Sequence, residues 1–114
     1  MKSTIQTRLH QASSRHEEIG LLLSQPEVFS DQNRFRELSV EYAQLEPVVQ
    51  SWQKWQATRE AIDEARQMLN EADPDLREMA EEELQQASHR LSSLEQEIQL
   101  LLLLLKLLAY NGDL

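Results

Sequence analysis

The chain contains no cysteine, and only two glycines and three prolines occur among its 114 residues. The absence of cysteine excludes a disulfide framework and any thiol chemistry. The scarcity of glycine and proline argues against an all-β fold, which needs many tight turns. The remaining composition is dominated by Glu, Gln, Leu, Ala, Arg and Ser, most of which favour helices. The sequence therefore predicts one all-α domain.

A long hydrophobic run is also missing. The apolar stretch near the C-terminus has about ten apolar positions and is broken by Lys106, whereas a membrane-spanning helix needs ~20 residues. The N-terminal segment is polar and charged, without the apolar core of a signal peptide. We therefore expect a soluble, cytoplasmic protein with no membrane partner.

The net charge of −9 is concentrated in the second half of the chain. Residues 1–60 carry seven basic and eight acidic side chains, whereas residues 61–114 carry four basic and twelve acidic ones. Because acidic surfaces repel phosphate backbones, we expect no DNA partner and no broad RNA-binding surface in the second half.

No group of residues in the sequence is typical of catalysis. A Gly-rich phosphate loop, a nucleophile elbow and a His/Cys ligand set are all absent. His16 precedes Glu17, but adjacent helical positions do not face each other, so we expect a half-buried histidine beside solvated glutamates. The acidic residues within 78–83 are expected to form a solvated face, because a tight calcium site needs roughly six to eight converging oxygens. We therefore predict no enzyme activity, no cofactor and no metal.

Apolar residues recur at steps of three and four in three long segments and form a seam along each, as in helices that pack like a coiled coil. These seams include Leu9 and Ile19 in the first segment, Ile62 in the second and Ile98 in the third. The first helix is expected to have Ser3 or Thr4 as its N-cap and to stop before Pro26. The second is expected to begin near Ser30 or Asp31.

The third helix has the clearest start, because Asp73 suits an N-cap and Pro74 suits the first helical position. In the second helix, Pro47 either kinks the helix or splits it at Glu46. A kink is favoured, because the apolar phase continues past the proline without a slip. The predicted fold is an all-α, three-helix antiparallel, coiled-coil-like bundle whose long middle helix is kinked near Pro47.

Two further groups of residues have competing interpretations. Trp52 and Trp55 lie on the apolar seam of the second helix, so core packing is favoured for at least one of them over a base-stacking platform. The best candidates for a basic contact patch are four arginines, and the alternative is ordinary surface charge balanced by nearby glutamates. These candidates are Arg8, Arg15, Arg34 and Arg36.

Three segments carry a resemblance to a known family. They are RHEEI at 15–19, RFRELSVEYAQLEPVV at 34–49 and REMAEEEL at 77–84. In order and approximate spacing they resemble the N-terminal helical domain of bacterial peptide chain release factor 1, over about residues 1–103. The closely related second release factor has a comparable domain. The Gly-Gly-Gln and Pro-x-Thr signatures of the family are absent from the chain. Residues 104–114 form an atypical leucine-rich tail, where the family has a proline and an acidic linker.

The resemblance implies a non-catalytic domain that docks a class I release factor on the ribosome during translation termination. Its expected partner is the base of the large-subunit stalk, reached through the parent factor, and the four arginines are the candidate contacts. The codon-reading and catalytic domains are expected to be lacking. The alternative is a self-associating coiled-coil protein with no ribosomal role, which forms a homodimer through the leucine run that begins at Leu100 and ends at Leu108.

Overall fold

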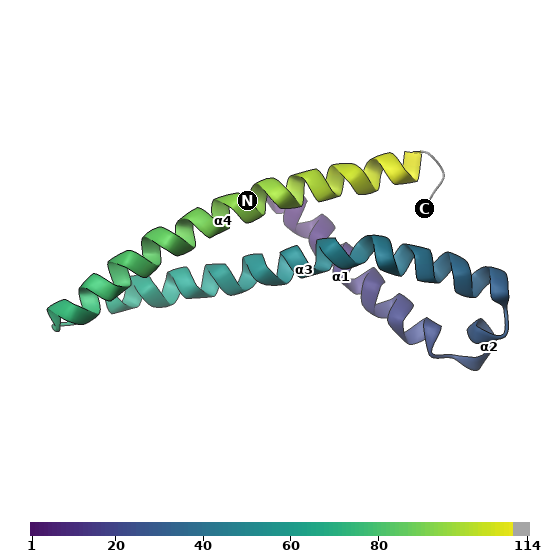
Figure 1. The fold of residues 1–114 in the computed structure, drawn as a ribbon, viewed down its shortest axis with the longest axis horizontal. Coiled ribbons are helices and arrows are strands. Elements are labelled where there is room, and N and C mark those ends of the chain that lie inside the picture. Colours follow the sequence, from purple (N-terminus) through teal and green to yellow (C-terminus); the bar gives the residue numbers. More distant parts are fainter. Residues whose placement is uncertain (111–114) are drawn as a thin grey trace. The chain divides into compact units, whose positions relative to one another are not determined.

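The computed structural model describes residues 1–110, and this part of the chain is all-α. The helices in the described range are α1 (Ser3–Leu23), α2 (Pro26–Phe29), α3 (Gln32–Met68) and α4 (Pro74–Tyr110) (Figure 1). They belong to two compact units. Unit 1 comprises Met1–Gln50 together with the chain from Ile98 onward, and unit 2 comprises Ser51–Glu97. The predicted all-α class is confirmed, with long helices that pack against each other.

The starts of α3 and α4 follow the predicted capping rules. The side chain of Asp31 accepts a hydrogen bond from the backbone N–H of Arg34 at 3.2 Å. The side chain of Asp73 likewise accepts from the backbone N–H of Asp75 at 2.9 Å, and Pro74 is the first helical residue. Each aspartate satisfies one of the backbone donors that a helix start leaves unpaired.

The start of α1 differs from the prediction. Ser3 is already the first helical residue, and Lys2 occupies the N-cap position without a side-chain hydrogen bond. The prediction of Ser3 or Thr4 as N-cap was therefore wrong. The physical reason is exposure: Lys2, Ser3 and Thr4 all face solvent, so water can satisfy the first backbone donors and no capping side chain is required.

A single helical turn, α2, lies in the connection between α1 and α3, where no helix was predicted from the sequence. Pro26 is its first residue, a position that suits the fixed backbone angle of proline. Val28 is fully buried, whereas Phe29 is exposed and places its ring at 5.5 Å from that of Phe35 in an edge-to-face contact. The connection thus contributes Val28 to the core of unit 1. A four-residue turn is too short for apolar periodicity to reveal it.

Helix α3 continues through Pro47, so the chain does not adopt the split at Glu46. Pro47 is exposed, while Val48 and Val49 beside it are buried. Because the Pro47 ring faces solvent, water can reach the backbone carbonyl one turn earlier, which lacks its usual N–H partner. The burial of Val48 and Val49 shows that the apolar face continues past the proline.

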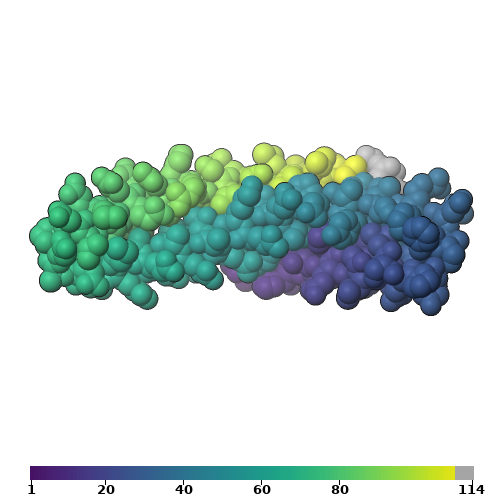
Figure 2. Space-filling view, turned by 60° about the horizontal axis from the view of Figure 1, so that its bottom comes forward, coloured from purple at the N-terminus to yellow at the C-terminus, as the bar shows by residue number. Residues whose placement is uncertain are grey.

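Much of the core of each unit comes from the predicted seams. In unit 1 the most completely buried side chains include Leu9, Ile19 and Ile98, which lie on those seams, together with Val28 and Val48, which do not. In unit 2 the second half of α3 and the first half of α4 lie side by side, and Figure 2 shows their teal and green atoms in contact. Buried residues of unit 2 include Trp55, Ile62, Ala65, Ala80 and Ala87.

Both tryptophans are buried, which confirms the prediction of core packing. Their rings stack with centroids 5.2 Å apart. The indole N–H of Trp55 donates to the carboxylate of Glu95 on α4 at 3.2 Å. The guanidinium of Arg59 lies 5.1 Å from the Trp55 ring centroid, within cation–π range. Trp55 is therefore buried between the helices of unit 2 and is not available as a platform for bases.

The leucine run is helical, and its two faces differ in exposure. One face is half-buried and includes Leu101, Leu102, Leu105 and Leu108. The other face is exposed and includes Leu100, Leu103, Leu104 and Leu107. Despite this run, none of the helices described over residues 1–110 has a stretch long and apolar enough to cross a membrane.

Candidate docking surfaces

Arg15 joins α1 to α3 through a two-pronged ion pair. Its Nε and Nη2 atoms donate to the two carboxylate oxygens of Glu41 at 2.7 and 2.8 Å. Its Nη1 atom donates to Glu18, one helical turn further along α1, at 2.7 Å. The hydrogen bond with Glu41 is the main reason that the pKa of Arg15 lies above its usual value. Arg15 is thus bound to its own chain and is only partly accessible to a partner.

A second polar contact between α1 and α3 involves His16. Its Nε2 atom is hydrogen-bonded to the carboxylate of Glu46, and its ring stacks on that of Tyr42 with centroids 4.0 Å apart. The Glu46 carboxylate also accepts from the side-chain amide of Gln50 at 3.2 Å. The prediction of a half-buried histidine is confirmed, because His16 packs within the helix pair.

The other three candidate arginines are exposed, but they do not form one patch with Arg15. Helices α1 and α3 run antiparallel in unit 1 (Figure 1). Arg8 on α1 and Arg36 on α3 therefore lie in opposite directions from the contact between Arg15 and Glu41. At a rise of ~1.5 Å per residue, they are separated by roughly 18 Å along the helices. Arg34 and Arg36 remain as an accessible basic pair at the start of α3. Their contact with the ribosome stays a prediction.

Unit 2 contains a groove, here called the hairpin groove, beside the connection between α3 and α4. Its volume is about 460 Å³. The apolar lining consists of Ala61, Ala65, Met68, Met79 and Ala80. The polar lining consists of Glu64, Glu82, Glu83 and Gln86. The alanines leave space between the helices, while the methionines supply flexible apolar walls.

A second groove in unit 2 has a different charge. It also has a volume of about 460 Å³ and is lined by Lys54, His89 and Arg90 together with Thr58, Ser93 and Glu97. Arg90 donates to Glu83 at 3.0 Å, and the Thr58 hydroxyl donates to the Lys54 carbonyl at 2.7 Å. These internal bonds engage the side chains of Arg90 and Thr58.

The acidic run of α4 is largely solvated, as predicted. Glu78, Glu81 and Glu82 are exposed, and Glu83 is half-buried and paired with Arg90. Glu78 and Glu81 line neither groove, whereas Glu82 and Glu83 line the hairpin groove. Among the described residues, no cluster of three or more His, Cys, Asp or Glu side chains could hold a metal ion.

Comparison with known families identifies a matching family model. The family model described as the PCRF domain matches residues 12–106, which include the segments 15–19, 34–49 and 77–84. The matched region also contains most of α1 and α4 and the whole of α3. No solved structure matches the chain.

Proposed function

Because the chain belongs to the PCRF domain family, a peptide chain release factor-type domain, we propose that it is the non-catalytic ribosome-docking domain of a class I release factor. In this role it takes part in translation termination in the cytoplasm. The observation that carries the proposal is the family match across residues 12–106. Codon reading and ester cleavage belong to other parts of the parent factor.

The proposed partner is the base of the large-subunit stalk. Of the four candidate arginines, Arg34 and Arg36 remain as the proposed contact. Arg15 is engaged by Glu41, and Arg8 on α1 is distant from Arg36 along unit 1. In the described part of the chain, neither Arg34 nor Arg36 has a side-chain ion pair. Both side chains are therefore free to meet a carboxylate or a phosphate of a partner.

Co-sedimentation of the chain with large ribosomal subunits, with and without the stalk-base protein, tests this proposal. We expect binding that is lost without that protein and that falls about tenfold in R34A/R36A, since each lost charge contact costs on the order of 0.5–1 kcal/mol. The matched control is R66A/R77A, which removes the same charge from exposed arginines of unit 2. Equal weakening in both variants, or binding that ignores the stalk base, would contradict the proposal.

A homodimer is the second candidate, and the exposed leucine face favours it. Leu100, Leu103, Leu104 and Leu107 have the i, i+3, i+4, i+7 spacing of one helical stripe, and each is at least half exposed. A second copy could cover this stripe and remove its apolar surface from water.

Sedimentation equilibrium of L103Q/L107Q tests the homodimer. We expect the dimer dissociation constant to rise at least about tenfold, because two leucine contacts worth on the order of 1 kcal/mol each are lost. The control is L21Q, which changes an exposed leucine of α1. A chain that is monomeric before substitution, or a dimer unaffected by L103Q/L107Q, rejects the leucine stripe as a dimer interface.

A further inference from the structure

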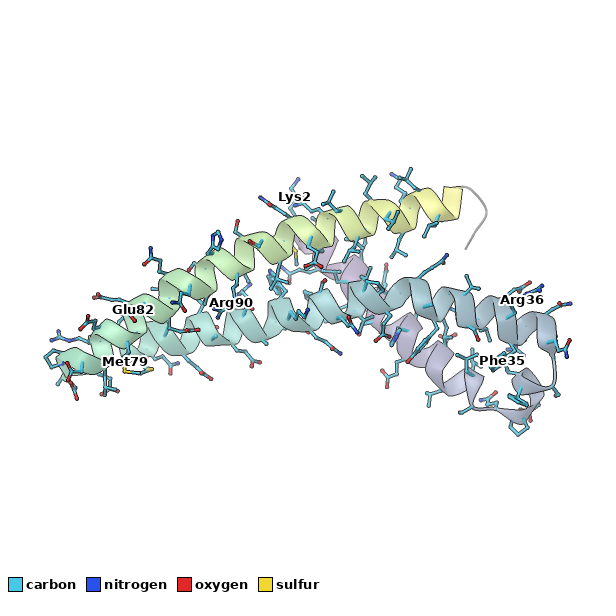
Figure 3. All side chains as sticks on the ribbon, viewed as in Figure 1. Lys2, Phe35, Arg36, Met79, Glu82 and Arg90 are labelled. Carbon is cyan, nitrogen blue, oxygen red and sulfur yellow. The ribbon has the colours of Figure 1, made fainter. Side chains whose placement is uncertain are left out.

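The hairpin groove joins an apolar interior to an acidic rim. Met79 on α4 is 60% exposed although it lines the groove, and Met68 on α3 faces the same space from a half-buried position. Figure 3 shows Met79 and Glu82 on the part of α4 that follows the hairpin connection. Methionine side chains adapt their shape and are common at surfaces that bind apolar anchors. The groove can therefore receive a large apolar side chain.

The charge around the groove is strongly negative. Residues 60–83 contain ten acidic and only two basic side chains. On the rim, Glu83 is paired with Arg90 at 3.0 Å, but Glu64 and Glu82 have no hydrogen bond or ion pair within residues 1–110. These two carboxylates lie on opposite helices and flank the apolar interior. A phosphate or another anion is therefore repelled from the groove, while a lysine or arginine is attracted.

We propose that the hairpin groove is a docking site for a basic amphipathic helix of a partner protein. One apolar residue of that helix inserts between Met68 and Met79, and flanking lysines or arginines pair with Glu64 and Glu82. This is the helix-in-groove mode of recognition, in which apolar anchors give affinity and the charges at the rim select the partner. The groove shares no residue with the arginines proposed for ribosome contact, so each proposal can fail alone.

The charge of the groove decides between this occupant and a nucleic acid. A phosphate backbone approaching Met79 would meet Glu64 and Glu82 without a free cation in the groove lining. A basic helix instead neutralises both carboxylates and covers the exposed methionine. Its binding should weaken as salt is raised, because the rim is solvent-exposed and its ion pairs are screened.

The test uses the full chain and a synthetic amphipathic helix of leucine and lysine, about 18 residues long. Two control peptides are used: one has the same composition in a scrambled order without an apolar face, and the other has glutamate in place of lysine. NMR titration of the labelled chain locates binding, and calorimetry measures the affinity. We expect shifts at Ala61, Met68 and Met79 with the amphipathic basic peptide, and at least tenfold weaker binding of both controls.

Substitutions in the chain distinguish binding at the hairpin groove from a general attraction of the basic peptide to the acidic charge of unit 2. We expect E64Q/E82Q and M79S each to weaken peptide binding about tenfold. The matched control E78Q/E81Q removes the same charge from exposed glutamates outside the groove and is expected to change binding less than threefold. Circular dichroism verifies that each variant remains helical. Equal weakening in E78Q/E81Q, equal binding of the scrambled peptide, or shifts confined to other surfaces would overturn the proposal.

Discussion

Replacing Trp55 with alanine is expected to lower the free energy of unfolding by about 3–5 kcal/mol. Trp55 is only 4% exposed, and the substitution would leave a large cavity between the helices of unit 2. It would also remove the stacking with Trp52 and the hydrogen bond to Glu95. Urea denaturation followed by circular dichroism measures this change. A loss of this size is a large fraction of the total stability of a small domain.

A more conservative substitution at the same position provides the control. W55F keeps an aromatic ring in the core but loses the N–H that donates to Glu95. We expect W55F to cost about 1–2 kcal/mol, well below the alanine variant, because a lost hydrogen bond and a smaller ring account for it. If W55A unfolds at nearly the same urea concentration as the unsubstituted chain, Trp55 does not hold the core of unit 2.

Replacing Ile19 with alanine is expected to lower the free energy of unfolding by about 2–5 kcal/mol. Ile19 is fully buried on α1, so the missing methylene and methyl groups leave a cavity in unit 1. Native-state hydrogen exchange of amides in α1 and α3 gives a measurement specific to this unit. Faster exchange at Tyr42 and Leu45, on the part of α3 within unit 1, is the expected signature.

The control for Ile19 lies two residues further along the same helix. L21A removes a similar volume from a side chain that is 65% exposed, and it is expected to change stability by no more than about 0.5 kcal/mol. If L21A destabilises as much as I19A, Leu21 is covered in solution, and the assignment of the buried face of α1 is wrong.

Much of the core was predictable from the spacing of apolar residues alone. Leu9, Ile19, Ile62 and Ile98 all lie on the predicted seams, and all are buried. Seam positions are predictable because a regular helix presents every third or fourth residue on one side. The burial of Val28 could not be predicted in this way, because Val28 lies in a four-residue turn that is too short to show apolar periodicity.

Burial outside the predicted seams was also missed. Ser51 and Thr58 are polar, and yet both are buried in unit 2. Thr58 satisfies its hydroxyl on the carbonyl of Lys54 one turn earlier, which makes its burial tolerable. Apolar periodicity does not indicate such positions, because it counts only hydrophobic residues.

The sequence alone does not show which of the candidate contact residues are accessible to a partner. The sequence identifies Arg15 and Arg34 equally well as basic residues, but the structure pairs the first with Glu41 and leaves the second exposed. The hairpin groove was not predicted, because it requires Ala65 and Met79 to lie on facing helices. Small residues in a helix give no local signal that distinguishes a packed interface from an open groove.

The sequence by itself determined the helical class, the starts of α3 and α4 and most of the buried face. These features depend on residues within a few positions of each other, such as Asp73 and its neighbour Pro74. Only the tertiary structure decided which arginines are engaged and where a groove opens. The physical reason is distance along the chain: Arg15 meets Glu41, and Trp55 meets Glu95, only after separate helices have packed together.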